Sequence, residues 1–295
     1  MILFFENGRQ ARGDAIRSAF LRSDLAPVPM SLEADFLSDE ETNQMLQQGK
    51  VITTGSGDVF EIIKREKVSL ASVQDERLRS GVRITAMLQR CLPVAFVRKL
   101  AIIKEDSTLS GIYRASGANI SGIDADFPVP RFCCLVGQTP SFAIQQVLHE
   151  EGGTVRWRQG KLQFRRLVDL FRQDPVLTLP DFNSIDTQSG FLERHSVPTC
   201  FSTGDDGGIA MGDTSKARVM RFSPFKSTLR LNNMSKAIIR RQPFNLAYNQ
   251  RLNAGDRISV VGQPDMVILT AVHAVHAGDR KNNQYTRIFL GSLEA

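Results

Sequence analysis

The sequence predicts a β-rich α+β protein in which two barrel-like or sandwich-like regions flank a smaller α+β unit. Three observations support this fold class. Apolar residues alternate from Val28 to Phe36, which is typical of a strand with one buried face. Strand-forming residues return in the last third of the chain, in Ile258–Val261 and Met266–His273. Between these regions, Thr139-Pro140 begins the clearest helix of the sequence.

Length and composition indicate a folded protein of two or three domains. The chain has 295 residues, 42% hydrophobic and 23% charged, which is ordinary for a globular protein and excludes wholesale disorder. We expect a first β-barrel domain at 1–100, a helix–hairpin module at 101–175, a long connection at 176–215 and a second β-barrel domain at 216–295. The net charge of +6 permits an acidic partner without requiring nucleic acid.

The sequence carries no targeting signal that we can identify. Met1–Glu6 lacks the basic start and long apolar stretch of a signal peptide, and no apolar run approaches the roughly 20 residues of a membrane span. We therefore expect a protein that is not exported and has no membrane span. The four cysteines are expected to be reduced and buried, with Cys133 and Cys134 on opposite faces of a strand; they are Cys91, Cys133, Cys134 and Cys200.

The first hundred residues are predicted to be mostly strands with two short helices. Asp14 caps the first predicted helix, whose apolar face is Ile16, Ala19 and Phe20. Ser38–Glu41 has the spacing of a capping box and begins the second. The remaining segments are predicted strands, the first two forming a hairpin around Gly55–Gly57: Val51–Thr54, Val59–Lys64, Val82–Met87 and Val94–Ile103.

The middle of the chain predicts two helices and a hairpin. Ser107 caps a short helix that ends at Gly117, and Thr139-Pro140 opens the longer one, which stops at Gly152-Gly153. The hairpin follows directly, with strands at Thr154–Arg158 and Lys161–Arg165 around the turn Gln159-Gly160.

The two-residue turn fixes the register of this hairpin. Trp157 then faces Leu162, and Val155 faces Phe164, on the side that packs against the helix. Arg158 faces Lys161 and Arg156 faces Gln163 on the other side, which we expect to be solvated or to meet an acidic partner. Trp157 is therefore expected to be needed for folding, whereas Arg156 and Arg158 are expected to be dispensable.

The final 120 residues are predicted as a connection followed by strands. Residues 174–215 have little periodicity, and Gly204–Gly212 is expected to be an exposed flexible loop and the first site of proteolysis. The strands predicted after it are Val219–Phe222, Ile258–Val261, Met266–His273 and Tyr285–Leu290, the last with an edge that a neighbouring chain could extend.

No constellation in the sequence predicts catalysis, a cofactor or a metal. His273 and His276 are three apart on a strand, so they point to opposite faces and cannot share an ion. His149–Glu151 diverge at a helix end, and Gly204–Asp213 lacks the spacing of a calcium loop. Phosphate-binding, dinucleotide-binding and nucleophile-elbow motifs are absent from the sequence, as is CxxC.

One group of residues suggests an alternative function as a nucleic-acid-binding module. Its basic side chains lie within a short strip, with aromatic residues nearby: Arg156, Arg158, Lys161, Arg165 and Arg166. The predicted register places Trp157 and Phe164 on the face opposite Arg156 and Arg158, which favours a core role for the two aromatic side chains.

Two segments resemble a known family. The helix Gly137–Gly153 with its hairpin is similar to a module in the baseplate hub proteins of contractile-tailed bacteriophages, which are related to the spike proteins of type VI secretion. Ala254–Gly262 followed by Met266–His273 is similar to the closing barrel of such hubs. The resemblance is one of module order, and it covers most of the chain without a diagnostic signature.

The resemblance implies a structural, non-enzymatic role in a virion tail assembled in the host cytoplasm. Family hubs have two tail-tube-like barrels per chain, and three chains form a pseudo-sixfold ring between the tail tube and the central spike. The expected partners are therefore two further copies, a tail-tube or tube-initiator protein, a spike protein and possible baseplate wedge proteins. Genomic DNA would pass through the channel without specific binding. Because no lysozyme domain or needle follows before Ala295, we expect a separate spike protein. Another virion or tail assembly protein is the alternative.

Overall fold

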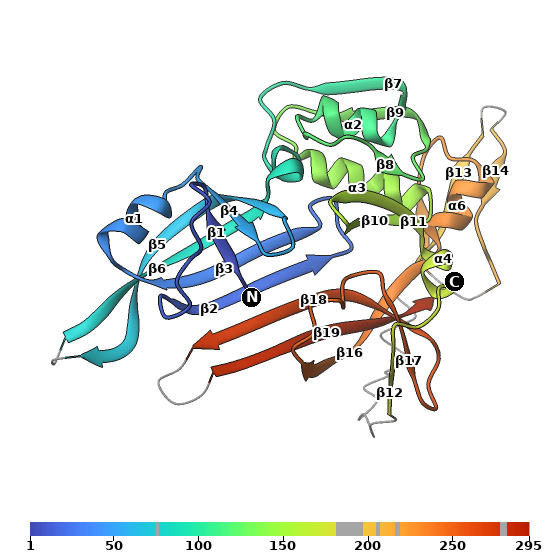
Figure 1. Cartoon of the computed structure of the whole chain (residues 1–295). Coiled ribbons are helices and arrows are strands. Elements are labelled where there is room, and N and C mark those ends of the chain that lie inside the picture. Colours follow the sequence, from blue (N-terminus) through green and yellow to red (C-terminus); the bar gives the residue numbers. More distant parts are fainter. Residues whose placement is uncertain (75–76, 181–196, 205–206, 216–218, 278–281, 295) are drawn as a thin grey trace.

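A computed structural model describes residues 1–74, 77–180, 197–204, 207–215, 219–277 and 282–294. It is β-rich with few helices, which confirms the predicted fold class. Figure 1 shows one large sheet at the base, a compact unit of helices and short strands above it, and a small sheet at one side. The four predicted domain boundaries stay a prediction.

The large sheet contains strands from both ends of the chain. Its main path runs β1-β4-β5-β6-β3-β2-β18-β17-β12, and β19 pairs with β18 and β16. The strands are β1 (Leu3–Phe5), β2 (Ile16–Asp24), β3 (Met30–Leu37), β4 (Val51–Thr54), β5 (Val59–Gln74), β6 (Arg77–Leu88), β12 (Leu177–Leu179), β16 (Ala237–Ala247), β17 (Arg257–Val260), β18 (Met266–Ala277) and β19 (Asn282–Glu294). Among the described residues, this strand order does not close on itself.

The pairing of β2 with β18 makes the two β-rich ends of the chain one continuous layer. Leu21 on β2 pairs with His273 on β18, and the same cross-strand row continues on both sides. From β5 to β16 the row reads Ile62, Ala86, Leu32, Leu21, His273, Thr286 and Leu246. Six of these seven side chains are buried, and Leu246 is partly buried. The buried face of the sheet therefore continues across the β2–β18 pairing, with His273 and Thr286 as its polar members.

The predicted helix after Asp14 is wrong, because Ile16–Asp24 is strand β2. A β-bulge between Ile16 and Ser18 shifts the alternation by one residue. As a result Ile16 and Ala19 are both buried although they are three apart, a spacing that also occurs on one face of a helix. The predicted strand at Val94–Ile103 is likewise wrong, since a 3₁₀ helix occupies Gln89–Ala95 and a loop leads to β7 (Ile102–Thr108).

The second helix and the other strands predicted in the first hundred residues are confirmed. Residues Met30, Leu32, Ala34 and Phe36 share the buried face of β3. The second helix is α1 (Glu40–Met45), although its cap is Asp39 rather than Ser38: the Asp39 carboxylate accepts from the Thr42 N–H at 2.7 Å. The predicted hairpin is β4–β5, and β6 contains the predicted strand Val82–Met87.

The middle of the chain folds into the unit above the sheet. It contains β7 paired with β9 (Pro128–Cys134), and β10 (Gly153–Arg158) and β11 (Lys161–Arg166) paired with β8 (Ile123–Asp124). Its helices are α2 (Leu109–Ala115), α3 (Pro140–Glu150) and α4 (Leu167–Phe171). The cap of α2 is Thr108, one residue after the predicted Ser107. Helix α3 begins after Thr139 as predicted.

The predicted hairpin register is confirmed residue by residue. Trp157 pairs with Leu162, Val155 with Phe164, and Arg158 with Lys161. Gln159 and Gly160 both have positive φ, 48° and 76°, as a two-residue turn matched to the strand twist requires. The apolar side belongs to the main core together with residues of α3.

The described residues between 197 and 234 form a third, smaller unit rather than a long unstructured connection. Strands β14 (Ile209–Met211), β13 (Thr199–Thr203) and β15 (Met220–Phe222) make a three-stranded sheet beside α6 (Thr228–Met234). The predicted loop Gly204–Gly212 therefore contains β14, and Gly204 N–H donates to the Gly208 carbonyl across the turn. The part of the predicted connection at 181–196 lies outside the described residues.

The C-terminal strands are confirmed, and one feature of them is corrected. Strands β17, β18 and β19 contain the predicted segments Ile258–Val261 (through Val260), Met266–His273 and Tyr285–Leu290. However, Tyr285–Leu290 is not an edge, because β19 pairs on one side with β18 and on the other with β16. Strand β16, which the sequence analysis missed, is the outer strand here.

Trp157 provides a test of the hairpin packing. Its side chain is 8% exposed, lies in the main core, and donates from Nε1 to Asp58 Oδ1 at 2.6 Å. We expect Trp157→Ala to lower the free energy of unfolding by about 3–5 kcal/mol, because a buried indole is lost. Trp157→Phe, which keeps an aromatic ring but loses the hydrogen bond, should cost less. Chemical denaturation measures both, and a parent-like midpoint for Trp157→Ala would show that the packing is wrong.

Candidate assembly surfaces

The basic strip suggested by the sequence is not a continuous surface. Arg156 is 8% exposed and Arg158 is partly buried, so the expectation that this side of the hairpin is solvated is wrong. Lys161 and Arg166 are exposed and Arg165 is partly buried. The strip is thus divided between the interior and the surface, which removes the main support for a nucleic-acid groove.

Arg156 and Arg158 join the hairpin to the loop between β16 and β17. Arg156 Nη1 donates to the Gly255 carbonyl and to Gln173 Oε1, each at 3.0 Å. Arg158 forms an ion pair with Asp256 and donates to the Ala254 carbonyl at 3.3 Å. The acidic partner that the sequence left open for this side of the hairpin therefore lies in the same chain.

The same loop is tied to the rest of the large sheet. The Ala254 N–H donates to Ser23 Oγ on β2 at 2.9 Å, and the Asn249 N–H donates to Thr286 Oγ1 on β19 at 2.8 Å. We call the loop Asn249–Asp256 with Arg156 and Arg158 the arginine junction. It connects both β-rich ends of the chain to the unit above them.

The charge and hydrogen bonding of Arg156 fit a structural role. Burial, and then the charges of Arg158 and Arg165, lower the pKa of Arg156 to about 10. Arg156 therefore remains charged at neutral pH, and its cost of burial is offset by hydrogen bonds to neutral acceptors. Gly255 is required beside it: its φ is +86°, and a Cβ there would lie 2.9 Å from Arg156 Cδ.

The candidate chemical sites of the sequence analysis are not brought together. His273 is buried and its Nδ1 lies 3.1 Å from Thr286 Oγ1. His276 lies on the other face of β18, between the rings of Phe20 and Tyr285. The prediction that the two histidines point to opposite faces is confirmed. Within the part of the chain that the structure describes, no group of three or more His, Cys, Asp or Glu side chains could hold a metal ion.

The carboxylates at the end of α3 are used in packing. Glu150 pairs with Lys226 at 2.6 Å, and Arg230 donates to Glu151 at 3.2 Å, so both join α3 to the unit that contains α6. The cysteines are all free; Cys91, Cys134 and Cys200 are buried, whereas Cys133 is exposed, which corrects the expectation for that one thiol. Among the described helices, none is long and apolar enough to cross a membrane.

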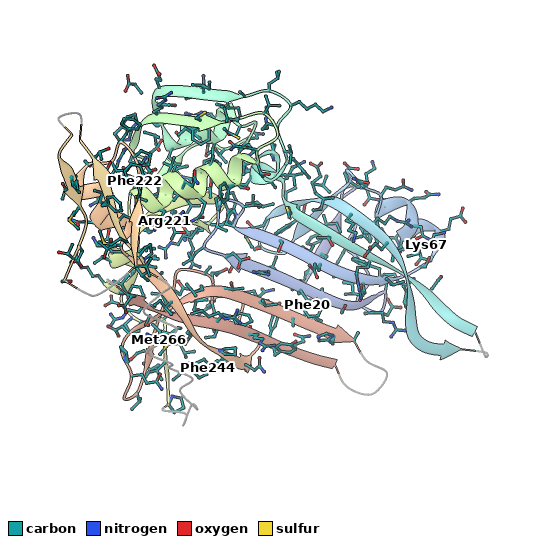
Figure 2. The ribbon with its side chains drawn as sticks, turned by 180° about the vertical axis from the view of Figure 1, so that it is seen from behind. Phe20, Lys67, Arg221, Phe222, Phe244 and Met266 are labelled. Carbon is teal, nitrogen blue, oxygen red and sulfur yellow. The ribbon has the colours of Figure 1, made fainter. Side chains whose placement is uncertain are left out.

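The solvent-facing side of the large sheet carries charges that pair with one another. Arg83 on β6 makes two hydrogen bonds with Asp35 on β3, at 2.7 and 3.0 Å. Arg22 pairs with Asp24 and Lys64 with Glu66, each along its own strand. Phe20 lies on this face of β2 (Figure 2). The face is therefore polar and locally neutralised, unlike the basic groove that specific nucleic-acid binding needs.

The small sheet leaves one of its faces apolar and exposed. Phe201 on its central strand lies between Met211 and Phe222, with which it pairs on either side. Met211 and Phe222 are 42% and 51% exposed. Phe222 and Arg221 lie on the opposite side of the molecule from Lys67 of β5 (Figure 2). Exposed apolar surface of this kind is typical of a contact site in an assembly.

The arginine junction predicts a stability cost that the sequence analysis did not expect. Asp256→Ala would leave Arg158 without its ion-pair partner in a partly buried site, and we expect a loss of about 3 kcal/mol in the free energy of unfolding. Lys161→Ala is the matched control, because Lys161 is exposed in the same hairpin. Chemical denaturation of both variants provides the test. Equal midpoints would mean that the Arg158–Asp256 ion pair contributes nothing to stability.

His273 predicts a dependence of stability on pH. Burial lowers its pKa below the usual value near 6.5, so below that pH the unfolded chain binds the proton more readily than the folded chain. The free energy of unfolding should therefore fall as pH drops from about 7 to 5. His273→Gln should reduce this fall, and His149→Gln reports the separate share of His149, whose pKa burial also lowers. Parallel pH curves for His273→Gln and the parent would exclude His273 as a source.

Comparison with protein-family models finds no match, and comparison with curated protein sequences finds none either. Solved structures do match. The tail protein from Neisseria meningitidis has a TM-score of 0.65 at 12% identity, covering 99% of this chain and 95% of that one. The 43 kDa tail protein of prophage MuSo2 from Shewanella oneidensis has a TM-score of 0.60 at 11% identity, covering 98% and 96%.

A third structure comes from a secretion machine. A component of the Escherichia coli type VI secretion system, described as similar to the T4 bacteriophage tail proteins gp27 and gp5, matches with a TM-score of 0.51 at 10% identity. This match covers 95% of the present chain and 76% of that chain. The resemblance stated from the sequence is thus confirmed at the level of structure: the chain has the fold of phage tail proteins.

Proposed function

We propose that this chain is the structural hub of a phage tail baseplate and that three copies form a pseudo-sixfold ring between the tail tube and the central spike. The observation that carries the proposal is the match to the Neisseria meningitidis tail protein, which covers nearly all of both chains. A match over the full length concerns the arrangement of all the units rather than one common module.

The symmetry of the proposed ring follows from two β-rich regions in each chain. Three chains would present six such regions, so one closed ring could meet a sixfold tube on one side and a threefold spike on the other. The continuous sheet supports this arrangement, because pairing of β2 with β18 and the arginine junction hold the two regions in a fixed relation. The two β-rich regions must keep fixed relative positions if one ring is to match both a sixfold tube and a threefold spike.

Two strands of the large sheet offer open edges for contacts between neighbours. Among the described residues, β16 has a ladder partner on one side only, and β4 covers the outer side of β5 only over Val59–Glu61. Such edges are templates for strand pairing between chains. Pro243 and a bulge in β16 limit how far an unselected partner could extend the ladder.

The proposed role is non-enzymatic, located in the virion tail, and assembled in the host cytoplasm. Its partners would be two further copies, a tail-tube or tube-initiator protein and the central spike protein, with baseplate wedge proteins as further candidates. DNA would pass through the ring without specific binding, which agrees with the paired charges on the open sheet face and with the burial of Arg156. A different tail assembly protein with the same fold is the competing proposal.

Copy number separates the two proposals. We expect native mass spectrometry and electron microscopy of the tail particle, or of the chain co-expressed with its tube and spike proteins, to find three copies around a channel. The closed symmetry of the ring is the physical reason. The chain expressed alone is the control, because a ring that needs a template would not form from it. A dimer, or six copies in equivalent positions, would contradict the hub proposal.

A further inference from the structure

The β7–β9 ribbon carries an exposed apolar surface at one of its ends. It consists of two segments that flank the ribbon, and its large apolar side chains are between 49% and 77% exposed: Phe96, Val97, Leu100, Leu135 and Val136. Arg98 and Lys99 lie within the first segment, and neither forms an ion pair with a described residue. We call these seven residues the apolar–basic end.

This surface is held in place by backbone contacts. The Arg98 N–H donates to the Gln138 carbonyl, and the Gly137 N–H donates to the Arg98 carbonyl, both at 3.0 Å. Gln138 also accepts from the Leu135 N–H through its side chain at 2.8 Å. The two segments therefore hold each other in one conformation. Little further conformational entropy would be lost when a partner binds.

The opposite end of the same ribbon is acidic. Asp106, Asp124 and Asp126 are exposed, and none of them pairs with a described lysine or arginine. Asp126 is fixed by the N–H groups of Ser110 and Phe127, at 3.1 and 3.0 Å. Exposed Ala125 and Pro128 supply apolar surface between the carboxylates. We call these five residues (Asp106, Asp124, Ala125, Asp126 and Pro128) the acidic end.

The two ends cannot contact each other within one chain. Ile102 pairs with Cys134 at the apolar–basic end, and Thr108 pairs with Pro128 at the acidic end. Six residue steps along a strand correspond to about 20 Å. Figure 1 shows β7 and β9 on the outer side of their unit, above α2 and α3 and away from the large sheet, where a second molecule can approach.

We propose that the apolar–basic end of one copy docks on the acidic end of the next copy. This inference rests on the proposed hub, whose ring needs a contact between copies. The opposite charges of the two ends are the argument for a second copy as the partner, since each end lacks the counter-charge that the other provides. Repeated in one direction from copy to copy, this contact is head to tail, which is the kind that generates a ring when its rotation closes.

Cross-linking tests which surfaces meet. A 1:1 mixture of unlabelled and ¹⁵N-labelled full-length chain, alone and co-expressed with tube and spike proteins, is treated with a carbodiimide that joins lysine directly to carboxylate. We expect mixed-isotope links from Lys99 to Asp106, Asp124 or Asp126. A ring of three copies without any such link would overturn this contact and leave the hub proposal standing. Absence of the links in both preparations overturns the contact as well.

Variants provide the matched controls. Leu100→Asp changes a side chain that is 77% exposed, so folding should be unaffected while the apparent association constant falls at least tenfold. Phe225→Asp, at a side chain that is 84% exposed elsewhere, should leave association unchanged. Lys99→Glu should weaken association, and adding Asp124→Lys in the same chain should restore it.

Sedimentation of these full-length proteins gives the readout. Association that Leu100→Asp leaves intact would overturn the contact. Sedimentation with tube protein or with anionic vesicles tests other partners. Binding of either one that Leu100→Asp abolishes, without any association between copies, would also overturn the contact and assign the surface to that partner. The copy number in the particle tests the hub proposal separately. Two or six copies would contradict that proposal, whatever the cross-links show.

Discussion

The arginine junction is the contact on which the arrangement of this molecule depends. The loop Asn249–Asp256 reaches β2 through Ser23, β19 through Thr286, and the hairpin through Arg156 and Arg158. Without it, the unit that contains α3 would contact the C-terminal strands chiefly through α4 and the small apolar cluster around Leu170 and Val267. Burying an arginine costs desolvation energy, which the hydrogen bonds of Arg156 to Gln173 and Gly255 offset here.

The continuous sheet and the arginine junction both fix parts of the chain relative to one another. Strand pairing between β2 and β18 fixes the two ends of the chain within one layer, and the junction fixes the unit above that layer. His273 shows how closely the two are connected, since it lies in the buried row between Leu21 and Thr286 while Thr286 holds Asn249. A displacement of the loop Asn249–Asp256 would therefore be transmitted to the sheet through the Thr286 side chain.

The features that could be predicted from the sequence are those that a few neighbouring residues determine. The two-residue turn Gln159-Gly160 was enough to give the hairpin register, and Thr139-Pro140 with Gly152 was enough to give α3. Helix prediction failed at Ile16–Ala19 because a bulge moved two buried residues to a helical spacing. The solvated side of the hairpin was wrong for another reason. The register was correct, but Asp256, which covers that side, lies 98 positions after Arg158. No local pattern contains that information.

The open edges of the large sheet and the two ends of the β7–β9 ribbon share one property: the members of each pair differ from each other. Two open edges of the large sheet, β5 beyond Glu61 and β16, differ in length and in proline content. The β7–β9 ribbon has an apolar–basic end and an acidic end. The unpaired charges have one sign at each end of the ribbon, so unlike ends attract each other and like ends repel each other. In the ring that we propose, this contact would repeat head to tail from copy to copy.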